Sequence, residues 1–276
     1  VLIYVLLFLG SSGVALALQH LKGLMKPVVI LTVLGLTAVI LIRYALSLPQ
    51  GNMQVILLGE DDQISVLLRT PGGQTLLING ATTTGDLSAA VSARLSPFER
   101  YLDAWLLTND ESQTLQEFYL LNQRFIPRQV YLSESSSNSL SLRRTLERLA
   151  DQGVTSRLLT GGLYFEMGDG AYLKVLKSTE QGTAFLLEWN RLRLIIPGGV
   201  PADEWLGELN PKDAILLLSG ADLIGDGATA AWLDLEPYVV LCTARNNVPD
   251  GWVNISQHGW VGITSDGSQL WLEAGR

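Results

Sequence analysis

The first 48 residues contain no aspartate or glutamate, and their only formally charged side chains are Lys22, Lys26 and Arg43. All 27 acidic residues lie further along the chain, together with 16 basic ones, so the rest of the chain carries a formal charge of −11. A stretch this apolar cannot form the surface of an ordinary globular domain. The sequence therefore divides into an apolar stem, residues 1–48, and an acidic domain, residues 49–276.

Two apolar runs make up the stem, residues 1–18 and 27–42, and the second can extend to residue 48 if Arg43 reaches the interface. Each approaches the roughly 20 residues that a helix needs to cross about 30 Å of hydrocarbon. A secretory signal peptide has one apolar run after a basic start, whereas this stem has two runs and no basic start. We predict two transmembrane helices in preference to a buried helical hairpin, with membrane lipid as their surroundings.

The loop between these helices, residues 19–26, carries Lys22 and Lys26, whereas the far end of the second helix carries only Arg43. The positive-inside rule places this loop in the cytoplasm and the acidic domain outside the inner membrane. The single cysteine, Cys242, allows no internal disulfide and fits either compartment. Because Val1 lies inside an apolar run, we expect the chain to be the tail of a longer membrane protein.

The acidic domain alternates strand and helix patterns. Strand-like runs come first, up to residue 79; helix and strand patterns alternate to residue 152; strands and turns dominate from residue 161 onward. In the helix expected at residues 141–152, Leu142, Leu146 and Leu149 share one face and the arginines lie outside with Glu147, which favours a solvated face over a nucleic-acid patch. The order predicts an α/β fold, two mixed sheets with helices outside.

The order of these elements, together with short sequence segments at matching positions, resembles the C-terminal part of ComEC-type competence proteins, the DNA-uptake channels of the inner membrane. In that family the last transmembrane helices are followed by a metallo-β-lactamase-like domain. The matching segments are Val55-Ile-Leu-Leu58, Thr75-Leu-Leu-Ile-Asn-Gly80, Met167-Gly-Asp-Gly170, Leu192 to Gly199, Ile215 to Ala221 and Thr264-Ser-Asp-Gly267. The resemblance implies an αββα sandwich and, as partners, the rest of the channel, other competence proteins and single-stranded DNA through local contacts.

The residues that would bind metal in that family are replaced in this chain. Its histidine positions correspond here to Asn109, Glu111, Thr114 and either Gly220 or Ala221, and its carboxylate positions to Gln113 and Gly199. Amide, hydroxyl and glycine cannot replace imidazole as zinc ligands. The whole chain has two histidines, His20 and His258. We therefore predict no catalytic residue, no metal site and no cofactor.

Three alternatives stay open. Asp61, Asp62, Asp110 and Glu111 could bind Ca²⁺ or Mg²⁺ through oxygen, although adjacent loop acids are more often simply solvated. Ser219 follows a buried strand, but no histidine is near it in sequence and Gly-x-Ser-x-Gly is absent. Among seven tryptophans, Trp105, Trp189 and Trp271 are expected in the core, while Trp205, Trp232, Trp252 and Trp260 border loops and suit either core or base stacking.

The prediction is a non-catalytic, membrane-anchored domain of a ComEC-like channel with a structural or strand-guiding role. The alternative is a free-standing membrane-anchored ligand-binding or sensor module. An active metal-dependent hydrolase is the third and least favoured reading. The net charge of the domain opposes binding of phosphate over its bulk surface.

Overall fold

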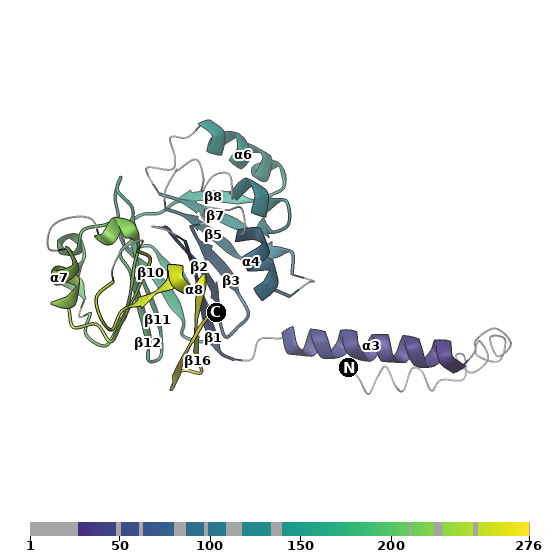
Figure 1. Cartoon of the computed structure of the whole chain (residues 1–276). Helices are drawn as coiled ribbons and strands as arrows, with labels where there is room; N and C mark the ends of the chain where they lie inside the picture. The colour runs from purple at the N-terminus through teal and green to yellow at the C-terminus, as the bar shows by residue number, and fades with distance from the viewer. Residues whose placement is uncertain are drawn as a thin grey trace. The chain divides into compact units, whose positions relative to one another are not determined.

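The chain forms two compact units, Val1–Leu48 and Pro49–Arg276, in a computed structural model. The structure describes residues 27–47, 51–60, 63–79, 87–96, 99–108, 118–133, 140–209, 211–223, 228–244 and 248–275. The first predicted transmembrane helix, residues 1–18, and the loop at 19–26 therefore lie outside the described residues. Figure 1 shows the elements of each unit.

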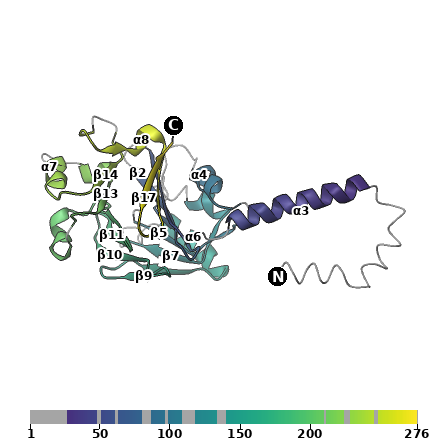
Figure 2. The same cartoon turned by 90° about the horizontal axis from the view of Figure 1, so that it is seen from below.

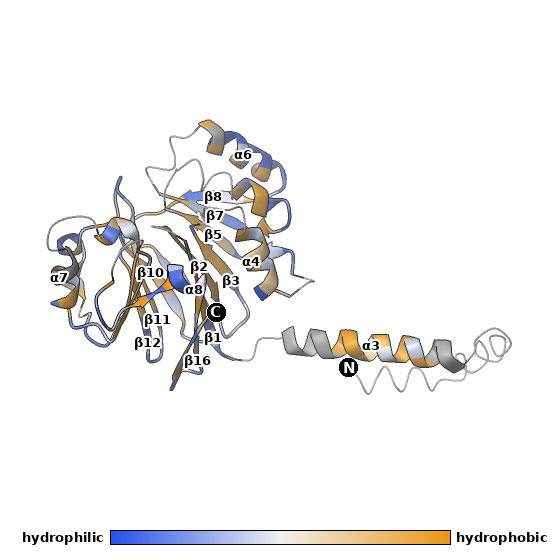
Figure 3. Cartoon of the chain, in the orientation of Figure 1, coloured by the Kyte–Doolittle hydropathy of each residue, from blue (hydrophilic) through white to orange (hydrophobic). Residues whose placement is uncertain are grey.

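The first unit is described through one helix, α3 (Pro27–Ser47), which confirms a helix over the second apolar run. Proline suits its first position because its fixed φ is helical and its missing N–H would have no partner there. Its described side chains are exposed and mostly apolar, with Leu31 70% and Leu34 62% exposed, and Figure 3 shows the same segment coloured as hydrophobic. Judged over the described residues alone, no helix is long and apolar enough to cross a membrane.

The second unit is built on two large sheets. The eight-stranded sheet has the order β17-β16-β1-β2-β3-β5-β7-β8, and the seven-stranded sheet β15-β14-β13-β12-β11-β10-β9. The strands of the first are β1 (Met53–Glu60), β2 (Gln63–Arg69), β3 (Thr75–Ile78), β5 (Ala104–Leu107), β7 (Gln129–Leu132), β8 (Thr155–Leu158), β16 (Trp260–Ser265) and β17 (Leu270–Ala274). Those of the second are β9 (Tyr164–Glu166), β10 (Tyr172–Ser178), β11 (Thr183–Trp189), β12 (Leu192–Ile196), β13 (Ile215–Leu218), β14 (Val239–Cys242) and β15 (Val253–Asn254).

Both sheets are mixed. The strands from β3 to β8 pair in parallel, as do those from β12 to β15, whereas the remaining neighbours within the two sheets are antiparallel. A short extra ladder joins β4 (Tyr101–Leu102) to β6 (Ile126–Pro127). Parallel strands need a crossover, and the helices supply it.

Helices cover the outer face of each sheet, so the two sheets face one another. On the eight-stranded sheet lie α4 (Leu87–Arg94), a helical stretch at 118–122 and α6 (Leu140–Asp151), and on the other sheet α7 (Ala228–Leu233), as Figures 1 and 2 show. The helix α8 (Ile255–His258) connects β15 to β16. One buried cluster fills the space between the sheets and two more lie under the outer helices. The predicted two mixed sheets with helices outside are thereby confirmed.

Sequence patterns found α6 because its buried leucines recur at helical spacing: Leu142 is 2% and Leu149 1% exposed. Two details of the prediction were wrong. The apolar run Leu102–Thr108 predicts one buried strand, whereas the structure interrupts it at Asp103, whose carboxylate accepts the Thr75 N–H. Trp271, expected in the core, is 44% exposed because β17 is an edge strand.

Of the other tryptophans expected in the core, Trp105 and Trp189 are buried. The loop-bordering pair Trp205 and Trp232 is also buried, each 4% exposed, with ring centroids 6.2 Å apart. Trp260 lies under the guanidinium of Arg94, 4.4 Å from its carbon to the ring centroid. The two stacked indoles are thus core residues and do not offer a face to a base.

The parallel strands give each sheet two distinct edges. We name the edge at which β3, β5 and β7 begin the amino edge, and the edge at which these strands and β12, β13 and β14 end the carboxyl edge. The two sheets share the carboxyl edge: a Cβ built on Gly59, at the end of β1, would lie 2.4 Å from Cγ2 of Thr243, just after β14. Only glycine fits so close an approach, and ligands of open α/β sheets usually bind at such carboxyl ends.

Candidate functional site

The candidate site begins where β12 and β13 end. These strands are parallel neighbours, so the segments that leave them lie side by side. The chain leaves β12 through Pro197-Gly198-Gly199 and leaves β13 through Ser219 into a 3-10 turn, η4 (Gly220–Leu223). In the resembled family these are two of the metal-binding positions, and Gly199 stands at one of them.

Asp222 ties the two segments together. Its Oδ1 accepts a hydrogen bond of 2.7 Å from the Gly199 N–H, and its Oδ2 accepts bonds from the Ser219 N–H at 2.7 Å and the Ser219 hydroxyl at 2.6 Å. The bond to the Ser219 N–H is the second half of a capping box, in which an acid three residues on satisfies the N–H of the cap. One carboxylate therefore closes η4 and also holds the end of β12.

Burial determines the electrostatics of this link. Asp222 is 7% exposed. Burial raises the pKa of Asp222, because a charged carboxylate is poorly solvated there, while the hydrogen bonds from Ser219 and Gly199 oppose that shift. No cation pairs with it within the described residues. Its three donors are therefore what stabilises the ionised form.

The neighbouring backbone leaves no room for a ligating side chain at Gly199. Its φ is +84°, and an added Cβ would meet the carbonyl oxygen of Gln181 at 3.1 Å. Gly198 is more restricted, with φ +57° and a Cβ position 2.3 Å from the carbonyl oxygen of Thr183. Left-handed φ and backbone at this distance both select glycine. A carboxylate at residue 199 would thus be strained.

On the eight-stranded sheet, Asn79 has the corresponding role. It follows β3 with φ +61°, a conformation that asparagine tolerates better than most residues. Its Oδ1 accepts hydrogen bonds from the N–H of Thr108, at 3.1 Å, and from the Thr108 hydroxyl, while its carbonyl accepts one from Trp105 Nε1 at 2.7 Å. Here an amide joins the ends of β3 and β5.

Thr243 follows β14 at this edge, and its buried Oγ1 has no hydrogen-bond partner within the described structure. Trp252 precedes β15, and its buried Nε1 also lacks a partner among the described residues. His258, the one histidine that the structure describes, has Nδ1 3.1 Å from the carbonyl oxygen of Gly275. This contact holds the imidazole of His258 at the end of β17, so we assign the residue a structural role.

The other predicted positions divide into two groups. Gly220 and Ala221 lie in η4, half-buried and exposed respectively. The residues outside the described part of the chain are Asp61, Asp62, Asn109, Asp110, Glu111, Gln113 and Thr114. Among the described residues there is no group of three or more histidine, cysteine or acidic side chains that could hold a metal ion.

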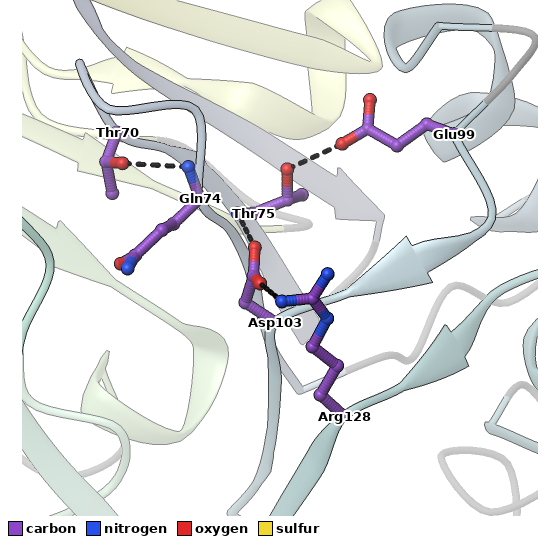
Figure 4. A network of polar contacts seen from close by, with 6 residues as sticks. All are labelled: Thr70, Gln74, Thr75, Glu99, Asp103 and Arg128. Atoms are coloured by element: carbon purple, nitrogen blue, oxygen red, sulfur yellow. Dashed lines mark hydrogen bonds and ion pairs between the residues drawn. The ribbon is translucent and has the colours of Figure 1, made fainter.

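A second polar network lies at the amino edge (Figure 4). Asp103 accepts a 2.8 Å hydrogen bond from the Thr75 N–H through Oδ2 and pairs through Oδ1 with Arg128 at 3.3 Å. The Thr75 hydroxyl donates to Glu99 at 2.9 Å, and the Gln74 N–H donates to the Thr70 hydroxyl at 3.0 Å. The network fixes the beginnings of β3, β5 and β7.

Sequence reasoning missed Asp222. The signal was present, since Ser219-Gly-Ala-Asp222 after a buried strand has the spacing of a capping box. What the spacing could not reveal is the bond to Gly199, which lies 23 residues away and arises from the parallel pairing of β12 and β13. Ser219, which has no histidine near it in sequence, donates its hydroxyl to the carboxylate of Asp222 in the structure.

Comparison with known proteins bears on the fold. No model of a known protein family matches this chain, and no curated protein matches it. Among solved structures it is similar to Zn²⁺-bound PqqB from Methylobacterium extorquens, at 16% identity and a TM-score of 0.53, over 69% of this chain and 88% of that one. It is also similar to the metallo-β-lactamase fold protein YhfI from Bacillus subtilis, at 12% identity and a TM-score of 0.52, over 72% and 90%.

These likenesses and the two-sheet topology show that the second unit has a metallo-β-lactamase fold. The fold implies a divalent metal at the carboxyl edge, and the donors described there do not fit one. Asn79 and Thr108 bind each other, residue 199 has no side chain, and both oxygens of Asp222 already accept hydrogen bonds. Zinc sites need imidazole, thiolate or free carboxylate groups that converge on the ion.

Proposed function

We propose that this chain is a non-catalytic, membrane-anchored part of a ComEC-like DNA-uptake channel, in which the metallo-β-lactamase fold has a structural or strand-guiding role. The fold alone does not determine the function, because the same fold supports unrelated activities. The channel assignment depends on the sequence resemblance, which spans the stem and the domain. Its partners would be the rest of the channel polypeptide or other competence proteins, with DNA contacted locally.

The observation that supports loss of catalysis is the carboxylate link from Asp222 to Gly199 and Ser219. In a metal-dependent hydrolase of this fold, the ion joins the loops at the carboxyl edge and lowers the pKa of a bound water. Here the link between the ends of β12 and β13 is made by a side chain of the protein itself. The same loops are held together without supplying an open coordination position.

The proposal also places the first unit in the inner membrane with the second unit outside the cytoplasm. It draws support from the stem, which has no acid over 48 residues, and from α3, whose described apolar side chains are exposed. Exposed leucine and valine along one helix are unfavourable in water and favourable in lipid. The two lysines of the loop at 19–26 supply the orientation.

Two assays on the full chain test this proposal. Membranes that carry it are washed with alkaline carbonate, and a reporter fused after Arg276 is scored on each side of the membrane. We expect retention in the membrane and an extracytoplasmic reporter. Release by carbonate would refute the anchor, and a cytoplasmic reporter would refute the orientation.

Catalysis is tested by incubating the purified chain with single- and double-stranded DNA in the presence of Zn²⁺ or Mn²⁺. The matched control is the Asp222→Asn variant, which keeps the size of the side chain. We expect no cleavage above the background that both proteins share. Cleavage by the unsubstituted chain that requires metal and is absent from the variant would refute the non-catalytic proposal in favour of a metal-dependent hydrolase.

A second candidate function is a free-standing membrane-anchored ligand-binding or sensor module. It is favoured by Thr243 Oγ1 at the carboxyl edge and Trp252 Nε1 before β15, two buried groups that lack a partner within the described residues. Such groups are costly unless something bonds to them. A ligand that raises the unfolding temperature of the chain, but not that of a Thr243→Val variant, would favour this candidate over the channel.

A further inference from the structure

The chain enters the second unit at the amino edge of the eight-stranded sheet. Gln54 pairs with Arg69, Arg69 with Thr75, and Asp103 lies beside Thr75, so β1 begins at the same edge as β3 and β5. The residue that follows the linker, Met53, therefore belongs to this edge. The carboxyl edge, with Asp222, is the opposite one.

Exposed arginines and a tyrosine gather at this same edge. Arg100 and Tyr101 precede β5, Arg124 follows the helical stretch at 118–122, and Arg128 precedes β7. Arg148 lies in the last turn of α6, its guanidinium carbon 6.0 Å from the ring centroid of Tyr119. The β4–β6 ladder and the hydrogen bond from the Ile126 N–H to the Arg100 carbonyl join the segment that contains Arg100 and Tyr101 to the segment that contains Arg124 and Arg128. We call these five residues the arginine surface: Arg100, Tyr101, Arg124, Arg128 and Arg148.

The basic side chains of this part are all arginines. The described residues 99–108, 118–133 and 140–158 contain seven arginines, no lysine and four acids, and the undescribed residues between them add Asp110, Glu111, Glu117 and Glu134. Of the described acids, Glu99 binds the Thr75 hydroxyl, whereas Asp103 binds the Thr75 N–H through one oxygen and pairs with Arg128 through the other. Arginines near helix C-termini also stabilise the helix dipole, which accounts for Arg124 and Arg148. Arg128 pairs with Asp103, and neither the helix dipole nor that ion pair accounts for Arg100, which precedes a strand.

Exposed apolar groups are interleaved with the arginines. Tyr101 is 54% exposed, Tyr119 46% and Leu120 38%. Arginine combined with tyrosine and leucine is typical of surfaces that rest on anionic lipid, where the cation meets headgroups and the ring lies at the interface. A nucleic acid would use the aromatic rings but gain nothing from an exposed leucine.

We propose that the arginine surface binds anionic lipid headgroups and so orients the second unit with its amino edge on the membrane and its carboxyl edge away from it. This inference depends on the proposed membrane anchor. A chain attached to a bilayer by a short linker has a high effective concentration at the lipid surface, so weak contacts suffice.

The test uses the full chain reconstituted in bilayers of phosphatidylcholine, with or without phosphatidylglycerol, followed by hydrogen exchange of backbone amides. Amides of residues 99–103 and 122–128 should exchange several-fold more slowly in the anionic bilayer. The variant Arg100→Glu/Arg124→Glu/Arg148→Glu should lose that difference. The matched control Arg157→Glu, an exposed arginine on β8, should keep it.

Exchange at Gly199 and Ser219, at the opposite edge, reports whether the triple variant is folded; if it is not, Arg124→Glu alone replaces it. Equal exchange in both bilayers, or protection that survives in the folded triple variant, would overturn the inference while leaving the anchor intact. Release of the chain by alkaline carbonate would overturn the anchor and the inference together. Similar protection of 99–103 by a single-stranded oligonucleotide in the neutral bilayer would overturn lipid in favour of nucleic acid.

Discussion

Two aspartates, Asp103 at the amino edge and Asp222 at the carboxyl edge, perform the same task in different surroundings. Each accepts a backbone N–H from a neighbouring strand or its end, Thr75 for Asp103 and Gly199 for Asp222. Asp103 is one-third exposed and pairs with Arg128, whereas Asp222 is buried and has three N–H or O–H donors in place of a cation. Water can hydrate the carboxylate of Asp103, so its charged form depends less on hydrogen bonds from the protein than that of Asp222.

This difference shows how the carboxyl edge is organised. A buried carboxylate costs more than it returns unless every oxygen is hydrogen-bonded. Asp222 is such a group, and both of its oxygens accept hydrogen bonds between the segments that follow β12 and β13. The carboxyl edge is therefore organised around an internal link, and the amino edge around groups that remain open to solvent.

The largest effect is expected from Asp222→Ala. Its loss leaves the Gly199 and Ser219 N–H groups without acceptors, which should lower the free energy of unfolding by about 3 kcal/mol. Urea unfolding in detergent, followed by tryptophan fluorescence, measures this, because Trp232 Nε1 donates to the Asp222 carbonyl at 2.8 Å. The exposed Asp203→Ala is the control and should change stability by less than about 0.5 kcal/mol. Equal effects of the two variants would contradict the role of Asp222.

At the amino edge we expect smaller losses of stability, and the losses should differ between Asp103→Ala and Arg128→Ala. Asp103→Ala removes the acceptor of a buried N–H and should cost about 1.5 kcal/mol. Arg128→Ala breaks only an exposed ion pair, with side chains 67% and 33% exposed, and should cost about 0.5 kcal/mol. The same unfolding measurement decides between them. A larger loss for Arg128 than for Asp103 would show that the ion pair, and not the backbone bond, holds this edge.

A finer difference concerns pH. Because the folded-state pKa of Asp222 is raised above its ordinary value of 3.8, the folded protein binds that proton more tightly than the unfolded chain. Its contribution is fully present below the unfolded pKa and is lost as pH rises through the folded pKa. The stability advantage of the unsubstituted protein over Asp222→Asn should therefore shrink as pH rises through this range. An advantage that grows with pH would mean that the three hydrogen bonds outweigh desolvation.

The smallest effect is expected in the rate at which the thiol of Cys242 is alkylated. It is fully buried at the end of β14, and burial raises its pKa to about 11. We expect no alkylation by a maleimide at pH 8 in the folded protein and complete alkylation in urea. Asp222→Ala should speed alkylation under native conditions, since it loosens a neighbouring strand end, whereas Arg128→Ala should not. Rapid alkylation of the unsubstituted protein would contradict the packing of this edge.

Much of the fold could be predicted because its elements have strong local signals. The leucines of α6 recur at helical spacing, and the turn at Asp266-Gly267 lies between two strand runs, as β16 and β17 confirm. Trp271 could not be placed, since the position of β17 at the edge of its sheet depends on the strand order and not on its local sequence. The strand β8 has four exposed residues and gives no hydrophobic signal.

The candidate site was predicted mainly as a set of replacements. Gly199 was identified at a ligand position, and the structure adds the reason that the position has to remain glycine, its φ of +84° and the carbonyl of Gln181. Asp222 was not identified because its partner is brought near by parallel pairing and not by sequence distance. The replacements at Asn109, Glu111, Gln113 and Thr114 remain predictions, as they lie outside the described residues.

We propose that an internal carboxylate link takes the place of the metal of this fold. Its most direct test is the zinc content of the purified full chain after growth with added zinc and dialysis against metal-free buffer, together with a zinc titration by calorimetry. We expect far less than one zinc per chain and no saturable heat, for the unsubstituted protein and for Asp222→Asn alike. One tightly bound zinc per chain, lost in the Asp222→Asn variant, would contradict it.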